Sequence, residues 1–152
     1  MATPEQFAQE LNRIALSIEP NTASVMRRVV GQLLEDVVRG TPVDTGKARS
    51  NWQVTLGAPS HTVIGPYAPG KKLGIGENSN ANAAIAAGQA ALRNITEGTL
   101  ETPVVVSNSV FYIDTLRRGT SRQQPVDWVD IALRKAATSL RLTNLLQRGN
   151  RR

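Results

Sequence analysis

Apolar residues recur at three- and four-residue spacing in two stretches of the N-terminal third of the chain, which is the pattern of an amphipathic helix. In the first stretch they are Phe7, Leu11, Ile14 and Ile18. In the second they form two adjacent rows, Val25, Val29, Leu33 and Val37 beside Met26, Val30, Leu34 and Val38. Thr3 and Pro4 suit the start of the first helix, and Gly40 and Pro42 suit the end of the second. Residues 1–40 are therefore predicted to be helical, and the second helix to be buried along its length.

The pattern changes to short alternations between residues 41 and 65. Residues 52–56 and 62–64 look like strands, and a Gly-Ala-Pro-Ser sequence separates them. This arrangement predicts two strands that pair with each other. Residues 66–80 concentrate Gly and Pro and include Lys71 and Lys72, which predicts a long loop.

Three further elements are expected in the second half. Residues 81–96 are rich in Ala, which predicts a helix that can approach a neighbour closely. Residues 103–116 hold the best strand signals, at 104–106 and 110–113. Residues 125–146 predict a last helix, and 147–152 a frayed basic tail. Together these elements predict one α+β domain over 1–152, with the N-terminal helices and a C-terminal helix packed on a small antiparallel sheet.

Composition excludes several classes of function. The 152 residues are 40% hydrophobic, enough for one core, and there is no cysteine, so disulfides, thiolate metal sites and thiol nucleophiles are absent. The N-terminus is polar and acidic, and no stretch approaches the roughly 18 apolar residues of a membrane span. We therefore expect a soluble, unprocessed protein with no membrane partner.

The net charge of +6 is unevenly distributed. Residues 1–116 carry nine Lys/Arg against ten Asp/Glu, whereas residues 117–152 carry nine against two, a net charge of +7. Such a basic end suits an acidic protein surface or the phosphates of nucleic acid. Its only aromatic residue is Trp128, which gives no stacking pattern for reading bases. A nucleic-acid-binding module therefore remains as an alternative function, without sequence-specific recognition.

The tripeptide at 44–46, Asp-Thr-Gly, also occurs around the catalytic carboxylate of aspartic proteases. Such an enzyme needs two carboxylates at close range, and the chain contains no second copy of the tripeptide. A helix stop, not a strand, precedes Asp44. We therefore expect Asp44 to cap a turn by accepting backbone N–H groups, with Gly46 free to adopt a positive φ. Arg49 is expected to bind either Asp44 or the C-terminal carbonyls of a helix.

Other catalytic patterns are also missing. His61 is the only histidine and is expected at the surface, because no partners for a metal site or a Ser-His-Asp relay accompany it. Gly74 and Gly76 lack the third glycine and the Gly-Lys-Ser/Thr ending of a phosphate loop. We predict no catalytic residue, metal or cofactor, and hence no enzyme. The aromatic residues Trp52 and Tyr112 are expected to fill the core in preference to anchoring an interface.

Two separated stretches carry a resemblance to a known family. TPVDTGKARSNWQVTLG, and about fifty residues later VSNSVFYIDTLRRGTSRQQPVDWVDIALRKA, resemble the tail-completion and neck proteins of tailed bacteriophages, including the lambda Z-type minor tail proteins. The sequence departs from the family at Arg117, where a glutamate is expected, and at Val126-Asp127, where a glycine is common. The matching positions are Pro42, Val43, Asp44, Thr45, Gly46, Arg49, Trp52, Asn108, Tyr112, Leu116, Gly119, Ser121, Gln123 and Pro125.

The resemblance implies a structural virion protein of the phage neck or tail end, assembled in the host cytoplasm. It implies a ring-shaped homo-oligomer, of six copies if the ring meets the tail tube, in contact with adjoining neck, connector or tail-tube proteins and with the DNA in the channel. Residues 119–121 are expected to form a turn and helix entrance, capped by Thr120 or Ser121. The residues expected at interfaces are Lys71, Lys72, Arg117, Arg118, Arg122, Arg141, Arg148, Arg151 and Arg152.

Overall fold

The computed structural model describes residues 22–68, 75–120 and 127–149. Two predictions concern residues outside these ranges: the first helix at 3–18 and residues 150–152 of the basic tail. The other residues of that predicted tail, 147–149, are not frayed but belong to the last helix, Trp128–Gly149. The site residues that lie outside them are Lys71, Lys72, Ser121, Arg122, Gln123, Pro125, Arg151 and Arg152.

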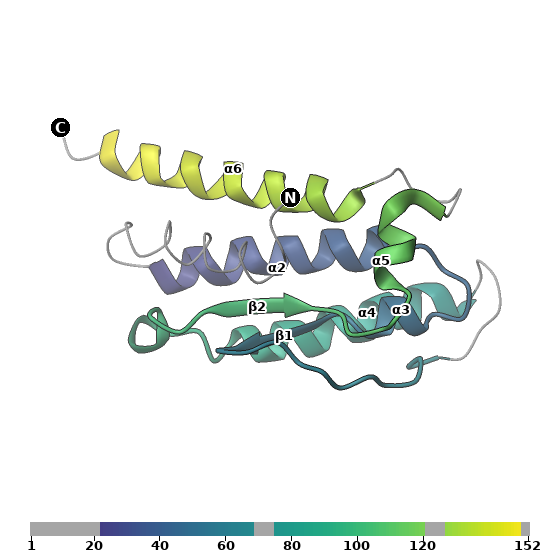
Figure 1. The fold of residues 1–152 in the computed structure, drawn as a ribbon. Helices are drawn as coiled ribbons and strands as arrows, with labels where there is room; N and C mark the ends of the chain where they lie inside the picture. Colours follow the sequence, from purple (N-terminus) through teal and green to yellow (C-terminus); the bar gives the residue numbers. More distant parts are fainter. Residues whose placement is uncertain (1–21, 69–74, 121–126, 150–152) are drawn as a thin grey trace.

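Helices and a two-stranded antiparallel sheet make up the described part, so the fold is α+β, with helices packed on a small sheet (Figure 1). In chain order the elements are α2 (Thr22–Gly40), α3 (Lys47–Ser50), β1 (Gln53–Leu56), α4 (Ile75–Leu92), the 3-10 helix η1 (Glu97–Thr99), β2 (Val104–Ser107), α5 (Ile113–Thr115), the π-helix η2 (Leu116–Thr120) and α6 (Trp128–Gly149). No helix in these ranges is both long and apolar enough to cross a membrane.

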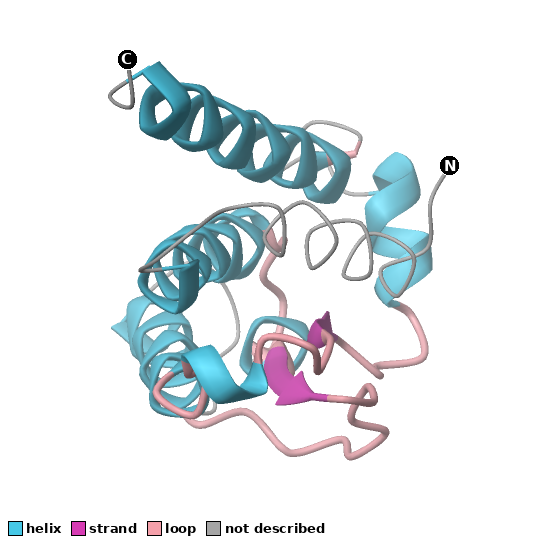
Figure 2. Ribbon diagram, turned by 90° about the vertical axis from the view of Figure 1, so that its left-hand side faces the viewer, coloured by secondary structure: helices cyan, strands magenta, loops and turns pink. Residues whose placement is uncertain are grey.

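Helix α2 is the centre of the core. It lies between α6 on one side and the layer formed by α4 and the sheet on the other (Figures 1 and 2). The predicted apolar rows account for this position, because residues from both rows are at most 3% exposed. These residues are Met26, Val29, Val30, Leu33, Leu34, Val37 and Val38.

Helix α4 approaches its neighbours closely, as its small residues predict. A Cβ placed on Gly88 would lie 2.2 Å from Leu34 Cδ2 and 3.3 Å from Val54 Cγ2, so only glycine fits between α2 and β1 here. The helix begins at Ile75, however, within the stretch predicted to be a loop. Asn80, in the part of α4 predicted to be a loop, is 1% exposed, and its side chain is hydrogen-bonded to Ser50 and Ala68 inside the fold.

The sheet does not pair the strands that the sequence analysis paired. Strand β1 pairs with β2, from Gln53 opposite Ser107 to Leu56 opposite Val104, and residues 62–64 form a loop. A side chain replaces the strand pairing at this loop: Asn51 Nδ2 donates to the Ile64 carbonyl at 2.9 Å, and Ile64 N–H donates to Asn51 Oδ1 at 2.8 Å. The prediction of a 52–56/62–64 strand pair is therefore wrong.

The second strand predicted in 103–116 is also absent. Residues 110–113 form a turn that leads into α5 and η2, with Ile113 N–H donating to the Val110 carbonyl at 3.0 Å. Asn108 starts this turn, since its Oδ1 accepts the Val110 N–H at 3.2 Å. The turn expected at Gly119 is instead the last part of η2.

Helix α6 packs on α2 through Trp128, three residues after its predicted start. Trp128 Nε1–H donates to the Val37 carbonyl at 3.3 Å, and a Cβ on Gly40 would lie 2.5 Å from Trp128 Cδ1. Gly40, the residue predicted to end α2, thus also leaves room for the Trp128 ring in the first turn of α6.

Candidate functional site

The two stretches that carry the resemblance meet at α3. Asn108 Nδ2 donates to the Ala48 carbonyl at 2.8 Å across 60 residues of sequence. Tyr112 lies against the same turn, close enough for the Thr45 side chain and the Ala48 backbone both to lower the pKa of its hydroxyl. The second stretch therefore contacts the first at Ala48.

The turn that precedes α3 depends on Gly46. This residue is the helix N-cap and has a φ of 81°, a left-handed conformation that glycine adopts readily, as predicted. Ser50 N–H donates to the Gly46 carbonyl at 3.0 Å. A Cβ on Gly46 would lie 2.2 Å from Asn80 Nδ2, so the position excludes other residues by contact as well as by conformation.

The capping role predicted for Asp44 is wrong. Because α3 begins at Lys47, the capping position falls on Gly46, and no side chain makes the cap hydrogen bond. The hydroxyl of Thr45 instead accepts the Lys47 N–H at 3.4 Å. The Asp44 side chain is exposed at the surface of the turn.

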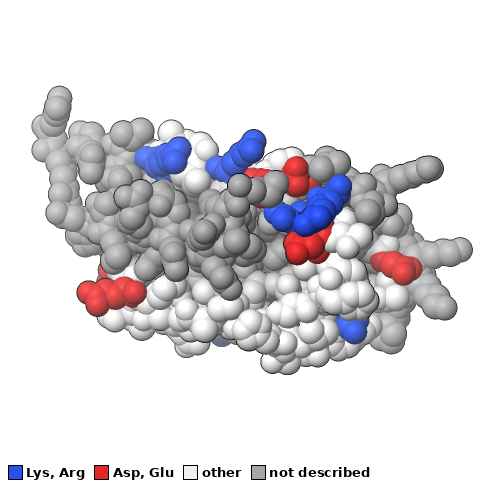
Figure 3. Space-filling model, viewed as in Figure 1, with Lys and Arg blue, Asp and Glu red and all other residues white. Residues whose placement is uncertain are grey.

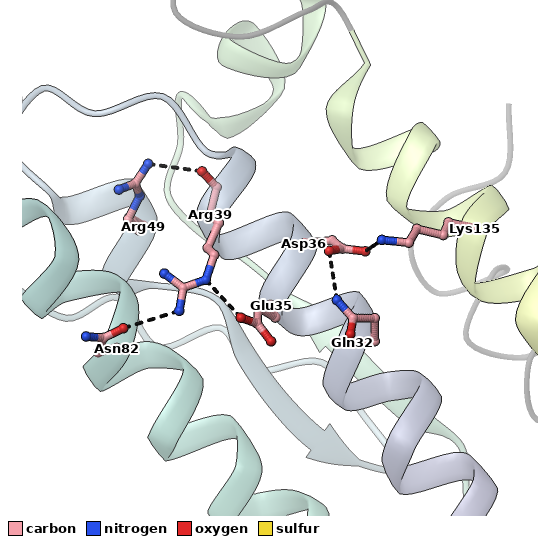
Figure 4. Close-up of polar contacts among 7 residues, drawn as sticks. All are labelled: Gln32, Glu35, Asp36, Arg39, Arg49, Asn82 and Lys135. Atoms are coloured by element: carbon pink, nitrogen blue, oxygen red, sulfur yellow. Dashed lines mark hydrogen bonds and ion pairs between the residues drawn. The ribbon is translucent and has the colours of Figure 1, made fainter.

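Arg49 binds helix carbonyls, the second of the two alternatives predicted for it. Its Nη2 donates to the Arg39 carbonyl at 3.1 Å and to the Thr41 carbonyl at 2.8 Å, and the residue is 5% exposed (Figure 4). The positive charge of a guanidinium at the C-terminal end of a helix also interacts favourably with the helix dipole. Arg49 therefore fixes the end of α2 relative to α3.

Of the two aromatic residues predicted to fill the core, only Trp52 does so. It is 6% exposed and belongs to the core, and its Nε1–H donates to Thr41 Oγ1 at 2.7 Å. Tyr112 is only partly buried and lies at the edge of a pocket. Burial raises the pKa of the Tyr112 hydroxyl above its usual 10.0, and the charge of nearby Asp44 acts in the same direction.

The pocket has a volume of about 490 Å³ and opens to solvent where the two stretches meet. Its described lining contains a single carboxylate, so it lacks the carboxylate pair that an aspartic protease needs. The lining residues are Pro42, Val43, Asp44, Thr45, Gly46, Lys47, Ala48, Tyr112 and Leu116.

The basic residues predicted at interfaces lie in different surroundings. Arg117 is bound within the chain, 3.7 Å from the Asp114 carboxylate and 3.7 Å from that of Asp130. Arg118 is exposed on η2, and Arg141 is exposed on α6. Arg148 also belongs to α6.

A second polar network crosses α2 and joins it to both neighbouring helices (Figure 4). Arg39 pairs with Glu35 at 2.9 Å and donates to Asn82 Oδ1 on α4 at 3.4 Å. Asp36 pairs with Lys135 on α6 at 3.2 Å. These contacts join three helices at the surface. The four charged side chains form two ion pairs, Arg39 with Glu35 and Lys135 with Asp36.

The sequence analysis missed three residues that shape the site. Ser50 and Asn80 hydrogen-bond to each other at 3.0 Å, and both are nearly fully buried. The Asn80 amide also accepts the Ala68 N–H and donates to the Ala68 carbonyl, each at 2.7 Å. Phe111 is the third missed residue, because it is 93% exposed although its sequence context resembles a strand. Ser50 and Asn80 stand out only by their burial, which the sequence does not reveal.

Comparison with known proteins does not assign a family. No family model, curated protein or solved structure matches this chain. Within the described residues no group of three or more His, Asp or Glu side chains could hold a metal ion. His61 is exposed, as expected.

Proposed function

We propose that this protein is a structural component of the neck or tail end of a tailed bacteriophage. It completes the tail or joins the tail to the head as a ring of identical copies, six where the ring meets the tail tube. Its partners are other copies of itself and the adjoining neck, connector or tail-tube proteins. It is assembled in the host cytoplasm and works by binding, without catalytic turnover.

The observation that carries this proposal is the contact between the two stretches that resemble the family. They are far apart in the sequence, yet Asn108 binds the Ala48 carbonyl, and Tyr112 lines the same pocket as residues 42–48. Chance similarity of two short stretches would not require them to touch. Their polar groups mainly bind the chain itself: Arg49 holds the end of α2, and Asn108 holds α3. Such residues build the turn and α3 and so support a surface.

Electron microscopy of phage particles that carry a labelled copy of this chain tests the proposal. We expect the label at the joint between head and tail or at the end of the tail. Particles assembled without the chain should lack a stable joint. A label along the whole tail, on the capsid shell, or absent from purified particles would reject the proposal.

A second candidate function, nonspecific binding of nucleic acid, is favoured by α6. Arg134 and Arg141 are exposed two turns apart on this helix, and no acidic residue follows Asp130 in the sequence. Figure 3 shows separate basic patches on the visible face, with acidic groups among them, in place of a continuous positive stripe.

Salt dependence of DNA binding tests this second function. A protein that neutralises phosphates loses affinity steeply as salt rises, and replacing both arginines with glutamine should lower the logarithmic slope by about 1 for each phosphate that is no longer neutralised. Arg39→Gln is a matched control, because Arg39 pairs with Glu35 inside the chain. Absence of measurable binding at low salt would exclude this function.

A further inference from the structure

Phe111 is an unusual surface residue. Its side chain is 93% exposed, and its ring makes one aromatic contact, an edge-to-face packing on Tyr112 with the centroids 5.1 Å apart. Among the other large apolar side chains whose exposure the structure describes, none is more than 56% exposed. A phenylalanine held in water gains free energy when a partner covers it, and single buried aromatic residues often dominate protein interfaces.

An open pocket lies next to this residue, because Tyr112, on which Phe111 packs, also lines the pocket. Pro42, Val43 and Leu116 supply apolar parts of its wall, and its volume of about 490 Å³ exceeds that of one aromatic side chain. Its own Phe111 does not enter it, as the exposure of that ring shows. One chain therefore presents both an aromatic anchor and a pocket that can receive one.

Charges beside the anchor and beside the pocket are complementary. Asp44 is exposed at the pocket, and Lys47 also lines it. In the elements that follow Phe111 in the chain, Arg118 is exposed on η2, and Asp114 on α5 is 71% exposed and lies 3.7 Å from Arg117. When the anchor of one copy meets the pocket of another, Asp44 can face Arg118 and Lys47 can face Asp114. Opposite charges in these positions favour the correct encounter and disfavour wrong partners.

We propose that Phe111 of one copy inserts into the pocket lined by residues 42–48, 112 and 116 of the next copy, with Asp44 facing Arg118 across the contact. The occupant is thus a second copy of this chain. This inference rests on the proposed function, in which copies of this chain bind one another. Phe111 packs on Tyr112, which also lines the pocket, so one patch carries both the anchor and the pocket and the contact is two-fold.

Introduced cysteines test the contact directly, since the chain has none of its own. Asp44→Cys and Arg118→Cys are made in separate chains, which leaves the anchor intact, and the two proteins are mixed under mild oxidation. We expect a disulfide-linked pair from the mixture. A chain that carries both substitutions should give linked pairs, because a two-fold contact closes with two copies. Absence of any linked product, or a ladder of more than two copies, would overturn the contact.

Removal of the anchor supplies the second measurement. Phe111→Ala should weaken self-association by about 30-fold, the size of an interface hot spot, and should abolish the disulfide between the Asp44→Cys and Arg118→Cys chains. Ile131→Ala is the matched control, because Ile131 is an exposed apolar residue on α6, 55% exposed. Equal association of the Phe111→Ala variant and the unmodified chain would overturn the proposal.

The outcomes separate this contact from the proposed function. Oligomers without the disulfide would reject the contact and leave a ring built through another surface. A chain that stays monomeric at every concentration would also reject the contact, whereas the proposed function would still be judged by the position of the label on particles. The fold of each variant is checked by the fluorescence of buried Trp52 and Trp128.

Discussion

Replacing Gly46 with alanine should lower the free energy of unfolding. The loss should be larger than for a methyl group added at any other position of the turn. The φ of Gly46 is 81°, and a residue with a Cβ costs about 1–2 kcal/mol in this region. The new Cβ would lie 2.2 Å from Asn80 Nδ2, so the Asn80 amide must move. This amide makes three hydrogen bonds, with Ser50 and with both backbone groups of Ala68, each worth about 1 kcal/mol. The expected loss is therefore about 2–5 kcal/mol.

Gly57 provides a matched control for the conformational part of this loss. Its φ is 92°, but a Cβ there meets nothing closer than Thr102 Cγ2 at 3.8 Å. Gly57→Ala should therefore cost only the strain, about 1–2 kcal/mol. Urea unfolding followed by the fluorescence of Trp52 and Trp128, both 6% exposed, measures each free energy of unfolding.

The contact with Asn80 can be tested with a double variant in the same urea unfolding experiment. Because Asn80→Ala removes the amide that collides with the new methyl group, its cost and that of Gly46→Ala should add to more than the cost of the double variant. Equal losses for Gly46→Ala and Gly57→Ala, or strict additivity with Asn80→Ala, would refute the reasoning.

Three other predictions concern the residues that hold the site together. Arg49→Lys should lower the free energy of unfolding by about 1–3 kcal/mol, because an ammonium cannot match the geometry with which the guanidinium reaches two carbonyls at the end of α2; an unchanged urea midpoint would contradict this. Asn108→Ala should cost about 1–2 kcal/mol because its bond to α3 is removed, and proteolysis should then reach the turn at 44–46 faster; protection equal to that of the unmodified chain would argue against the link. In a Tyr67→Phe background, the tyrosinate absorbance of Tyr112 should appear above its ordinary pKa of 10.0, and Asp44→Asn should lower that pKa. Since the folded pKa lies above the unfolded one, stability is complete below pH 10.0 and falls as pH rises towards the folded pKa; titration at or below 10.0 would disprove it.

Helix α2 could be predicted from sequence because its information is local. Two apolar rows repeat with the helical period over four turns, and the glycine at position 40 ends the helix where predicted. The pairing of β1 could not be predicted in this way. Its partner β2 lies about 50 residues away, while the nearby candidate at 62–64 is bound by the side chain of Asn51. A side-chain amide that replaces a strand leaves no periodic trace in the sequence.

The errors at Asp44 and Phe111 have a similar origin. A cap depends on which residue begins the helix, and a start at Lys47 places Gly46 at the cap. Phe111 follows Val110 in a run that favours strand, but Val110 is 2% exposed whereas Phe111 is 93% exposed. Asn108 decides between these outcomes by starting a turn, a tertiary effect that overrides β propensity.

The residues of the site divide into two groups that mutation can separate. Gly46, Arg49 and Asn108 contribute conformation or bonds within the chain, so their replacement should unfold or loosen the turn. Asp44 and Phe111 are exposed and contribute little to the fold, so their replacement should leave the free energy of unfolding nearly unchanged. If those two variants keep full stability and lose association, the exposed groups exist for a partner. A catalytic pocket would instead need its reactive groups oriented by the residues of the first group, so that replacing those residues changes the reactive geometry.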